Sequence, residues 1–360
     1  MNNTDVPYKQ LRGGSEVCLD VYPPAAEFLT GSVTRLPAVV YYHGGGMTVG
    51  TRTSWFPTWL QTRLNAKGIL FISADYQLIP ASSMHDVIRD VQDLFAFLGN
   101  EATVFKVPGD AGRTFGVDMA SVAVAGSSAG GYVAYLTALH ATPKPKAVLS
   151  LYGLGADFLN HQTLGLKFEP FFLGREMLDP IDFAEFVYPE NTKLDPTSES
   201  TLTYFPTTHP TKPGWPSNPR LPLCRLLLQM GVFLDYLAGQ HEPSLSLALR
   251  PLLEKSSDPA ILQEELGPLV PEEHRRIFPQ LNITPEFPPT FFFHGSEDTA
   301  VLPSDSVHLH SLLKGAGVET KIIIIDGASH SLDYHKDAET MYKAHFEEMA
   351  GFLATAVLGS

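Results

Sequence analysis

The chain has 360 residues, and its composition of 44% apolar and 18% charged residues is typical of a globular protein with one large domain or two modest ones. Its net charge of −14 argues against nucleic acid as a partner, because no basic excess is available to neutralise phosphates. The two cysteines, Cys18 and Cys224, predict neither a disulfide framework nor a metal site. No stretch approaches the ~18 apolar residues of a membrane span, and the first ten residues lack the apolar core of a secretory signal, so we expect a cytoplasmic protein.

The predicted elements alternate between strands and helices over the first 152 residues. Two short strand-like runs lie in the first 22 residues, and apolar strands are expected at 36–42, 69–74, 121–125 and 147–151. Helices are expected at 53–66, 84–98 and 129–140, and the second begins with a capping box formed by Ser83 and Asp86. Apolar strands that alternate with helices predict a mostly parallel sheet covered on both faces.

The alternation stops after Tyr152. Residues 154–287 are rich in Pro, Phe and Leu and contain no run typical of a buried strand, although 223–237 and 244–253 read as amphipathic helices. Strands resume at 290–293 and 321–325, and a last helix is expected over 336–356. We therefore predict an eight-stranded α/β core made of residues 1–153 and 288–360, with residues 154–287 inserted after the sixth strand as a helical lid.

Two glycine-rich motifs follow predicted strands. Residues 126–131, Gly-Ser-Ser-Ala-Gly-Gly, match the G-x-S-x-G pattern of a strained strand-to-helix turn that exposes one serine hydroxyl, here Ser128. Residues 43–46, His-Gly-Gly-Gly, follow the strand at 36–42, and three glycines there allow backbone N–H groups to converge on one point. Each motif alone is weak, but both together, in this order, predict nucleophilic catalysis by Ser128.

A serine nucleophile needs a base, and the base needs an acid that fixes its tautomer. On such a turn the acid and then the histidine follow the serine, each in a loop after a strand. Asp298 and His330 occupy these positions after the strands at 290–293 and 321–325, so we predict them as acid and base. Glu297 remains a competitor for the acid, whereas Asp326 precedes the histidine and reads as a turn residue. The other histidines considered, His308, His310, His335 and His345, read as helix or surface residues, and His308-x-His310 lacks a third metal ligand.

These motifs resemble the hormone-sensitive-lipase-like branch of the α/β-hydrolases, the esterases and lipases that carry His-Gly-Gly-Gly. The resemblance covers roughly residues 35–155 and 288–357 and includes Asp75-Tyr76 and Gly116-Val117-Asp118. It implies the α/β-hydrolase fold and an oxyanion hole formed by the N–H groups of Gly44, Gly45 and Ala129. It also implies that His43 and Gly46 orient the loop, and that no cofactor is needed.

The chain departs from the family pattern at three places. Ser127 stands where the family commonly has an acidic residue before the nucleophile. Gln77 stands where the family usually has arginine, so we expect a structural ion pair to be missing. A strand-like segment begins near Val6 in place of cap helices, so the inserted residues would form the lid alone. These departures bear on the choice of substrate.

The resemblance and the aromatic density of the inserted residues predict hydrolysis of a mid-sized hydrophobic ester or lactone. The sequence has no basic cluster that could hold a charged acyl group, which also favours a hydrophobic substrate. An acyltransferase or a lactone-forming enzyme of natural-product biosynthesis would use the same three residues, and a non-catalytic binding protein on this fold is a further alternative. A dinucleotide-binding oxidoreductase fits less well, because residues 126–131 follow several strands and 43–46 would have no role.

Overall fold

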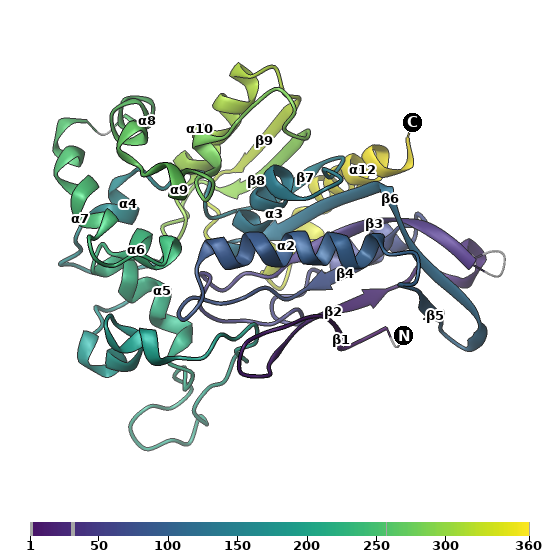
Figure 1. Cartoon of the computed structure of the whole chain (residues 1–360), viewed down its shortest axis with the longest axis horizontal. Coiled ribbons are helices and arrows are strands. Elements are labelled where there is room, and N and C mark those ends of the chain that lie inside the picture. The colour runs from purple at the N-terminus through teal and green to yellow at the C-terminus, as the bar shows by residue number, and fades with distance from the viewer. Residues whose placement is uncertain (1–2, 30–32, 257, 360) are drawn as a thin grey trace.

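The computed structural model describes residues 3–29, 33–256 and 258–359, and its centre is one mixed sheet (Figure 1). The sheet has nine strands in the order β1-β2-β4-β3-β6-β7-β8-β9, with β5 paired to β6. All strands from β4 to β9 along this path run parallel, whereas β1, β2 and β5 pair antiparallel with their neighbours. The strands are β1 (Val6–Gln10), β2 (Glu16–Tyr22), β3 (Val33–Tyr42), β4 (Leu70–Ala74), β5 (Phe105–Val107), β6 (Asp110–Ser127), β7 (Val148–Leu151), β8 (Thr290–Gly295) and β9 (Thr320–Ile325).

The predicted mostly parallel α/β sheet is confirmed, with one more strand than expected. Eight strands form the main path, and the three-residue β5 is the addition, too short to leave a periodic signal in the sequence. The inserted residues follow β7, which is the sixth strand of the main path in chain order.

Helices cover both faces of the sheet. One face packs against α2 (Met84–Gly99), α3 (Ala129–His140) and α10 (Pro303–Gly315), and the other against α1 (Thr58–Asn65) and α12 (Lys343–Leu358). In strand β3 successive side chains point to opposite faces of the sheet. Val40 and Tyr42 pack in the core on the first face, and Val39 and Tyr41 in the core on the second. Burial on both sides explains why the parallel strands are apolar throughout.

Several predicted helices are shorter than expected. The helix predicted at 53–66 begins only at Thr58, because Pro57 disfavours helical backbone at the residue before it. The one predicted at 223–237 is split by Gly231, which has φ +59°, into α5 (Arg220–Gln229) and α6 (Phe233–Ala238). The one at 244–253 ends as α7 (Leu245–Leu249) and continues as a 3₁₀ turn. The last helix is interrupted at Tyr342, between α11 (Ala338–Met341) and α12.

The inserted residues 154–287 contribute helices and a long irregular stretch. Besides α5, α6 and α7, the helices are α4 (His161–Leu164), α8 (Pro259–Leu266) and α9 (Glu272–Arg275). They gather beside one end of the sheet in Figure 1. That these residues act as a lid over a core of residues 1–153 and 288–360 remains a prediction. None of the described helices is long and apolar enough to cross a membrane.

Candidate active site

Ser128 lies at a sharp turn between β6 and α3. Its backbone has φ +51° and ψ −121°, a combination that residues other than glycine rarely adopt. A Cβ at Gly126 would overlap the backbone of Gly130, and a Cβ at Gly130 would overlap the carbonyl of Tyr42. The two glycines of the motif are therefore required by the close approach of strand and helix at this turn, and Ser128 is held in a strained conformation between them.

The structure brings Ser128, His330 and Asp298 together from three loops at strand ends. The His330 Nε2 lies 3.0 Å from Ser128 Oγ, and His330 Nδ1 lies 2.5 Å from Asp298 Oδ2. Asp298 comes three residues after β8 and His330 five residues after β9. A hydroxyl, an imidazole and a carboxylate linked by hydrogen bonds in this order have the geometry for proton transfer from the serine.

The Asp298 carboxylate is buried and held by further donors. Its Oδ1 accepts hydrogen bonds from the N–H groups of Ala300 at 2.8 Å and Val301 at 3.0 Å, and Oδ2 also lies 3.1 Å from His294 Nε2. Burial by itself raises the pKa of Asp298, but the hydrogen bonds from His294 and His330 outweigh it and hold that pKa well below its usual range. The carboxylate is therefore ionised and fixed in orientation.

His294 was missed by the sequence analysis. It is the fifth residue of β8 and is fully buried, with Nδ1 2.9 Å from Ser306 Oγ. The signal that could have found it is its position four residues before Asp298 at the end of the same strand. The loop between them folds back, so that the His294 side chain near the end of β8 reaches the Asp298 carboxylate.

The competing residues form no hydrogen bond with Ser128, His330 or Asp298 among the described contacts. Glu297 is exposed, and Asp326 is an exposed turn residue that accepts from Ser296 Oγ at 3.4 Å. His308 and His310 lie in helix α10 and form hydrogen bonds with Gln263 and Thr320, respectively. His335 lies 3.9 Å from Asp337 Oδ2, and His345 packs against the ring of Phe293. Within the described ranges, no group of three His, Cys, Asp or Glu side chains is arranged to hold a metal.

The loop of residues 43–46 lies beside the serine. A Cβ at Gly44 would come within 3.3 Å of Ser128 Cβ, so the backbone of this loop lies against Ser128. Gly45 has φ +118° and Gly46 φ +61°, and a side chain at Gly46 would overlap Cys224. In the described part of the chain, no acceptor receives the N–H of Gly44, Gly45 or Ala129. Three donors beside Ser128 are thus available to an oxygen of a bound substrate.

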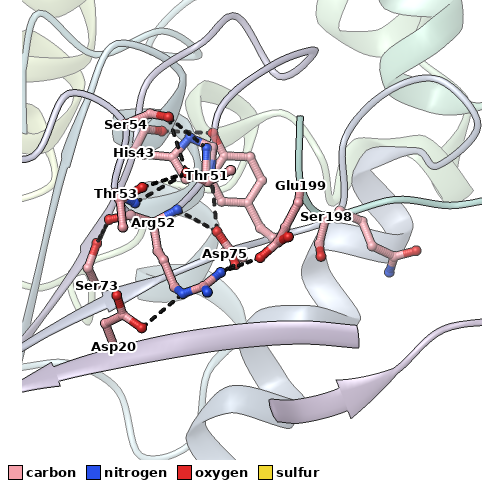
Figure 2. A network of polar contacts seen from close by, with 12 residues as sticks. Asp20, His43, Thr51, Arg52, Thr53, Ser54, Ser73, Asp75, Ser198 and Glu199 are labelled. Carbon is pink, nitrogen blue, oxygen red and sulfur yellow. Dashed lines mark hydrogen bonds and ion pairs between the residues drawn. The ribbon is translucent and has the colours of Figure 1, made fainter. Parts of the chain in front are cut away.

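A buried ion network anchors this loop (Figure 2). Arg52 donates to both carboxylate oxygens of Asp75, from its backbone N–H at 2.5 Å and from its guanidinium, and Nε donates to Asp20 at 2.9 Å. Glu199 and Asp5 also pair with the guanidinium. These ion pairs belong to Arg52, whereas position 77 carries a neutral glutamine, so the ion pair expected of an arginine there is absent.

Gln77 instead binds a second buried carboxylate. Its side-chain amide and its backbone N–H each donate to Asp90 at 2.8 Å. The other departure, Ser127, places its hydroxyl 2.7 Å from the Tyr41 hydroxyl, which donates to the carbonyl of Trp55 at 3.1 Å. Neutral hydrogen bonds thus fill the place where an acidic residue was expected.

Inserted residues also reach the same loop. Gly50 and Ser200 exchange both backbone hydrogen bonds, at 2.8 and 3.0 Å, and the N–H of Leu78 donates to the carbonyl of Thr197 at 2.8 Å. Glu199 lies between these contacts and pairs with Arg52. The segment 197–200 is therefore joined by backbone and side-chain bonds to Gly50 and Arg52, which follow the loop 43–46 in the chain, and to Leu78.

A cavity of about 840 Å³ opens above Ser128 and His330. Of the apolar inserted residues, Phe172, Leu173, Phe183 and Leu228 line it, whereas others, such as Phe158 and Phe233, are fully buried in the core. The cavity also has basic lining residues: Arg175, Lys212 and Arg225. The sequence shows no basic cluster because these residues are dispersed along it, but the structure brings all three to the lining of one cavity.

Comparisons with known proteins agree with this architecture. A family described as alpha/beta hydrolase fold matches residues 39–208, and the prolyl oligopeptidase family matches residues 266–357. The chain is similar to the non-reducing polyketide synthase pkbA of Emericella nidulans, with 27% identity over 93% of this chain, but it spans only 13% of that protein's length. It is similar to the probable carboxylesterase M8 of Phoma sp., with 29% identity over 32% of this chain and 37% of that one.

A solved structure of similar fold is that of the butyrate-bound esterase Est2 from Thermogutta terrifontis. The two share 16% identity with a TM-score of 0.56, over 99% of this chain and 95% of the other. At this identity the likeness concerns the fold, and it extends over the inserted residues as well as the sheet. Together with the family match and the probable carboxylesterase, it supports the α/β-hydrolase fold and a similarity to the branch of the esterases and lipases.

Proposed function

We propose that the protein is a serine hydrolase that cleaves a carboxylic ester through an acyl-enzyme on Ser128. The observation that carries the proposal is the chain of contacts from Ser128 Oγ to His330 at 3.0 Å and from His330 to Asp298 at 2.5 Å. The unengaged N–H groups of Gly44, Gly45 and Ala129 beside it support the same chemistry. Proton transfer and charge stabilisation would then take place at one point.

The mechanism follows from these contacts. As Ser128 attacks the ester carbonyl, His330 Nε2 takes its proton, and Asp298 stabilises the imidazolium that forms. The oxyanion of the tetrahedral intermediate accepts hydrogen bonds from the three N–H groups. Each such hydrogen bond typically lowers the activation barrier by about 2.7–4 kcal/mol. His330 then protonates the leaving alcohol, and a water molecule activated by the same imidazole releases the acid.

Labelling with a fluorophosphonate followed by peptide mass spectrometry tests the nucleophile. The expected adduct is on Ser128 and is absent from the Ser128→Ala protein. His330→Ala should abolish ester turnover and keep the far-UV circular dichroism of the parent. Ser127→Ala serves as the matched control, because it removes the adjacent hydroxyl while Ser128 remains. An adduct on Ser127, or full labelling of the Ser128→Ala protein, would show that the role of Ser128 is wrong.

A second candidate is transfer of the acyl group to an acceptor other than water, or formation or opening of a lactone. The similarity to segments of fungal polyketide synthases over 93% of this chain favours it, because it points to natural-product biosynthesis. The acyl-enzyme would be the same, and only the group that attacks it would differ. Product analysis with a nucleophilic alcohol added to the assay separates the two: transfer predicts a new ester in place of the free acid.

The residues 154–287 would form the lid over this site, and the substrate would be a mid-sized ester with a hydrophobic body. Aromatic side chains at the cavity support this, among them Trp55, Phe172, Phe183 and Trp215. A panel of esters of increasing acyl length tests it. The expected optimum lies above acetate, and activity confined to short, polar esters would contradict the proposal.

A further inference from the structure

Helix α5 turns one side toward the cavity above Ser128. The residues of this helix that line the cavity include Leu221, Cys224, Arg225 and Leu228, which recur at the spacing of one helical face. Three of the four are apolar or weakly polar, as the wall of a hydrophobic pocket requires. Arg225 is the exception, and a long cation in this stripe needs a physical reason.

Arg225 is buried but only partly paired. It is 5% exposed, and its Nη1 donates to the backbone carbonyl of Glu176 at 2.8 Å. Its one ionic contact is Nη2 to Glu176 Oε1 at 3.4 Å, longer than the roughly 2.7–2.9 Å of a charge-assisted hydrogen bond. The Glu176 side chain is 53% exposed, so water screens its charge.

A guanidinium has five N–H donors, and Glu176 is the only acceptor that Arg225 finds among the described residues. Burial of a cation without full pairing is unfavourable unless another partner is present. The remaining donors of Arg225 belong to a side chain that lines the cavity. They are available to an acceptor inside the cavity.

The charges around the cavity point the same way. The lining includes the cations Arg175, Lys212 and Arg225 against the carboxylates Glu176 and Asp182. The chain as a whole has 39 acidic and 25 basic residues, so this balance is the reverse of the average. Arg175 is exposed and forms no ion pair with any carboxylate in the described part of the chain. Such a local excess of positive charge attracts anions in a protein that otherwise repels them.

We propose that Arg225 is the centre of a second subsite of the cavity, which binds a carboxylate of the substrate remote from the ester that is cleaved. The substrate class is then an ester with an apolar or aromatic body that also carries a free carboxylate. The planar fork of the guanidinium suits bidentate binding of a carboxylate. This inference rests on the proposed function for its turnover assay, but the binding itself can be measured without turnover.

Two series of chromogenic esters test the subsite. In the first, 4-nitrophenyl monoesters of glutaric, adipic and suberic acid are compared with neutral 4-nitrophenyl esters of equal chain length. In the second, the butyrate ester of 4-hydroxybenzoate is compared with that of its methyl ester, which places the carboxylate on the alcohol side. For each pair the ratio of kcat/KM between acidic and neutral ester is compared among variants.

Arg225→Met should lower this ratio about tenfold or more in at least one series, the range expected for a hydrogen bond to a charged group. Arg225→Lys should give a ratio between those of the parent and Arg225→Met, because lysine keeps the charge and loses the planar fork of the guanidinium. Glu176→Gln should raise the ratio, because it removes the competing carboxylate. Arg113→Met is the matched control: it removes an arginine paired with Asp110 at 2.8 Å on the β5–β6 hairpin, away from the cavity, and should leave the ratio unchanged.

Binding of 4-phenylbutyrate and of its amide to the Ser128→Ala protein gives a readout that needs no catalysis. Trp55 and Trp215 line the cavity, so tryptophan fluorescence reports occupancy. Arg225→Met should weaken carboxylate binding about tenfold and leave amide binding unchanged. Equal effects of Arg225→Met on acidic and neutral ligands in both assays, or a Glu176→Gln protein that reproduces the loss, would overturn the subsite. Absence of any ester turnover and of a Ser128 adduct would overturn the proposed function while leaving the binding result to decide the subsite.

Discussion

Protonation of His43 provides a quantitative test of how the loop beside Ser128 is built. The ring is fully buried and stacks on Tyr76 with centroids 4.5 Å apart, and its Nδ1 lies 2.6 Å from the Gly44 carbonyl. Because a carbonyl only accepts, Nδ1 carries the proton in the neutral ring. Burial lowers the pKa of His43 from 6.5 to about 4, despite the opposing effect of the Gly44 carbonyl.

The sign of the effect on stability follows from linkage. Between pH 6.5 and 4 the unfolded chain binds a proton at this histidine and the folded chain does not, so stability rises with pH in this window. The contribution is fully present above pH 6.5 and is lost as the pH falls. Between pH 7 and pH 5 the loss from His43 alone amounts to about 2 kcal/mol.

Urea denaturation between pH 5 and pH 7 measures this slope in the parent and in His43→Phe. Phenylalanine keeps the ring on Tyr76 and cannot titrate, so the variant should lose about 2 kcal/mol less than the parent over this range, whatever its absolute stability. Tyr76→Phe is the matched control, because it removes a hydroxyl that donates to the His43 carbonyl at 2.7 Å and keeps the histidine. Its curve should run parallel to that of the parent. Parallel curves for the parent and His43→Phe would refute a neutral, desolvated His43.

Three further predictions concern the elements around Ser128. Asp298→Asn should lower kcat about 10³- to 10⁴-fold by removing the charge that fixes His330, whereas Glu297→Gln, an exposed neighbour, should leave initial rates on the same ester unchanged. Glu199→Gln should lower kcat by no more than about fivefold with little change in KM, because a half-exposed pair contributes about 1 kcal/mol or less. Gly130→Ala should lower the free energy of unfolding, measured with denaturant, by more than about 3 kcal/mol, since the new Cβ has no space.

Local patterns explain why much of the site could be predicted. Ser128 is flanked by two glycines that the strand-to-helix turn requires, and this requirement leaves a six-residue signature. Asp298 and His330 follow apolar strands within five residues, so predicting the strands also located the loops. The spacing between the three residues along the chain did not matter, because parallel strands bring their carboxyl ends to one edge.

The partners of these residues could not be predicted in the same way. Arg52 pairs with Asp75, and nothing near Arg52 in the sequence indicates Asp75 as its partner. Arg225 lies in a stretch whose other side chains are mostly apolar, and only the cavity shows that it joins Arg175 and Lys212. Such contacts depend on how distant segments pack, and residues 154–287 have no repeating pattern from which that packing could be inferred.

The inserted residues therefore bear on both parts of the reaction. Through Glu199 and Ser200 they hold the loop that supplies Gly44 and Gly45, and through Arg225 they present a cation to the cavity. A contact to the loop affects the transition state and should change kcat, whereas a contact to a remote carboxylate affects ground state and transition state alike and should change KM. If both assignments are right, Glu199→Gln and Arg225→Met should separate along these two constants, and their effects on kcat/KM for an acidic ester should add, since the two side chains share no contact.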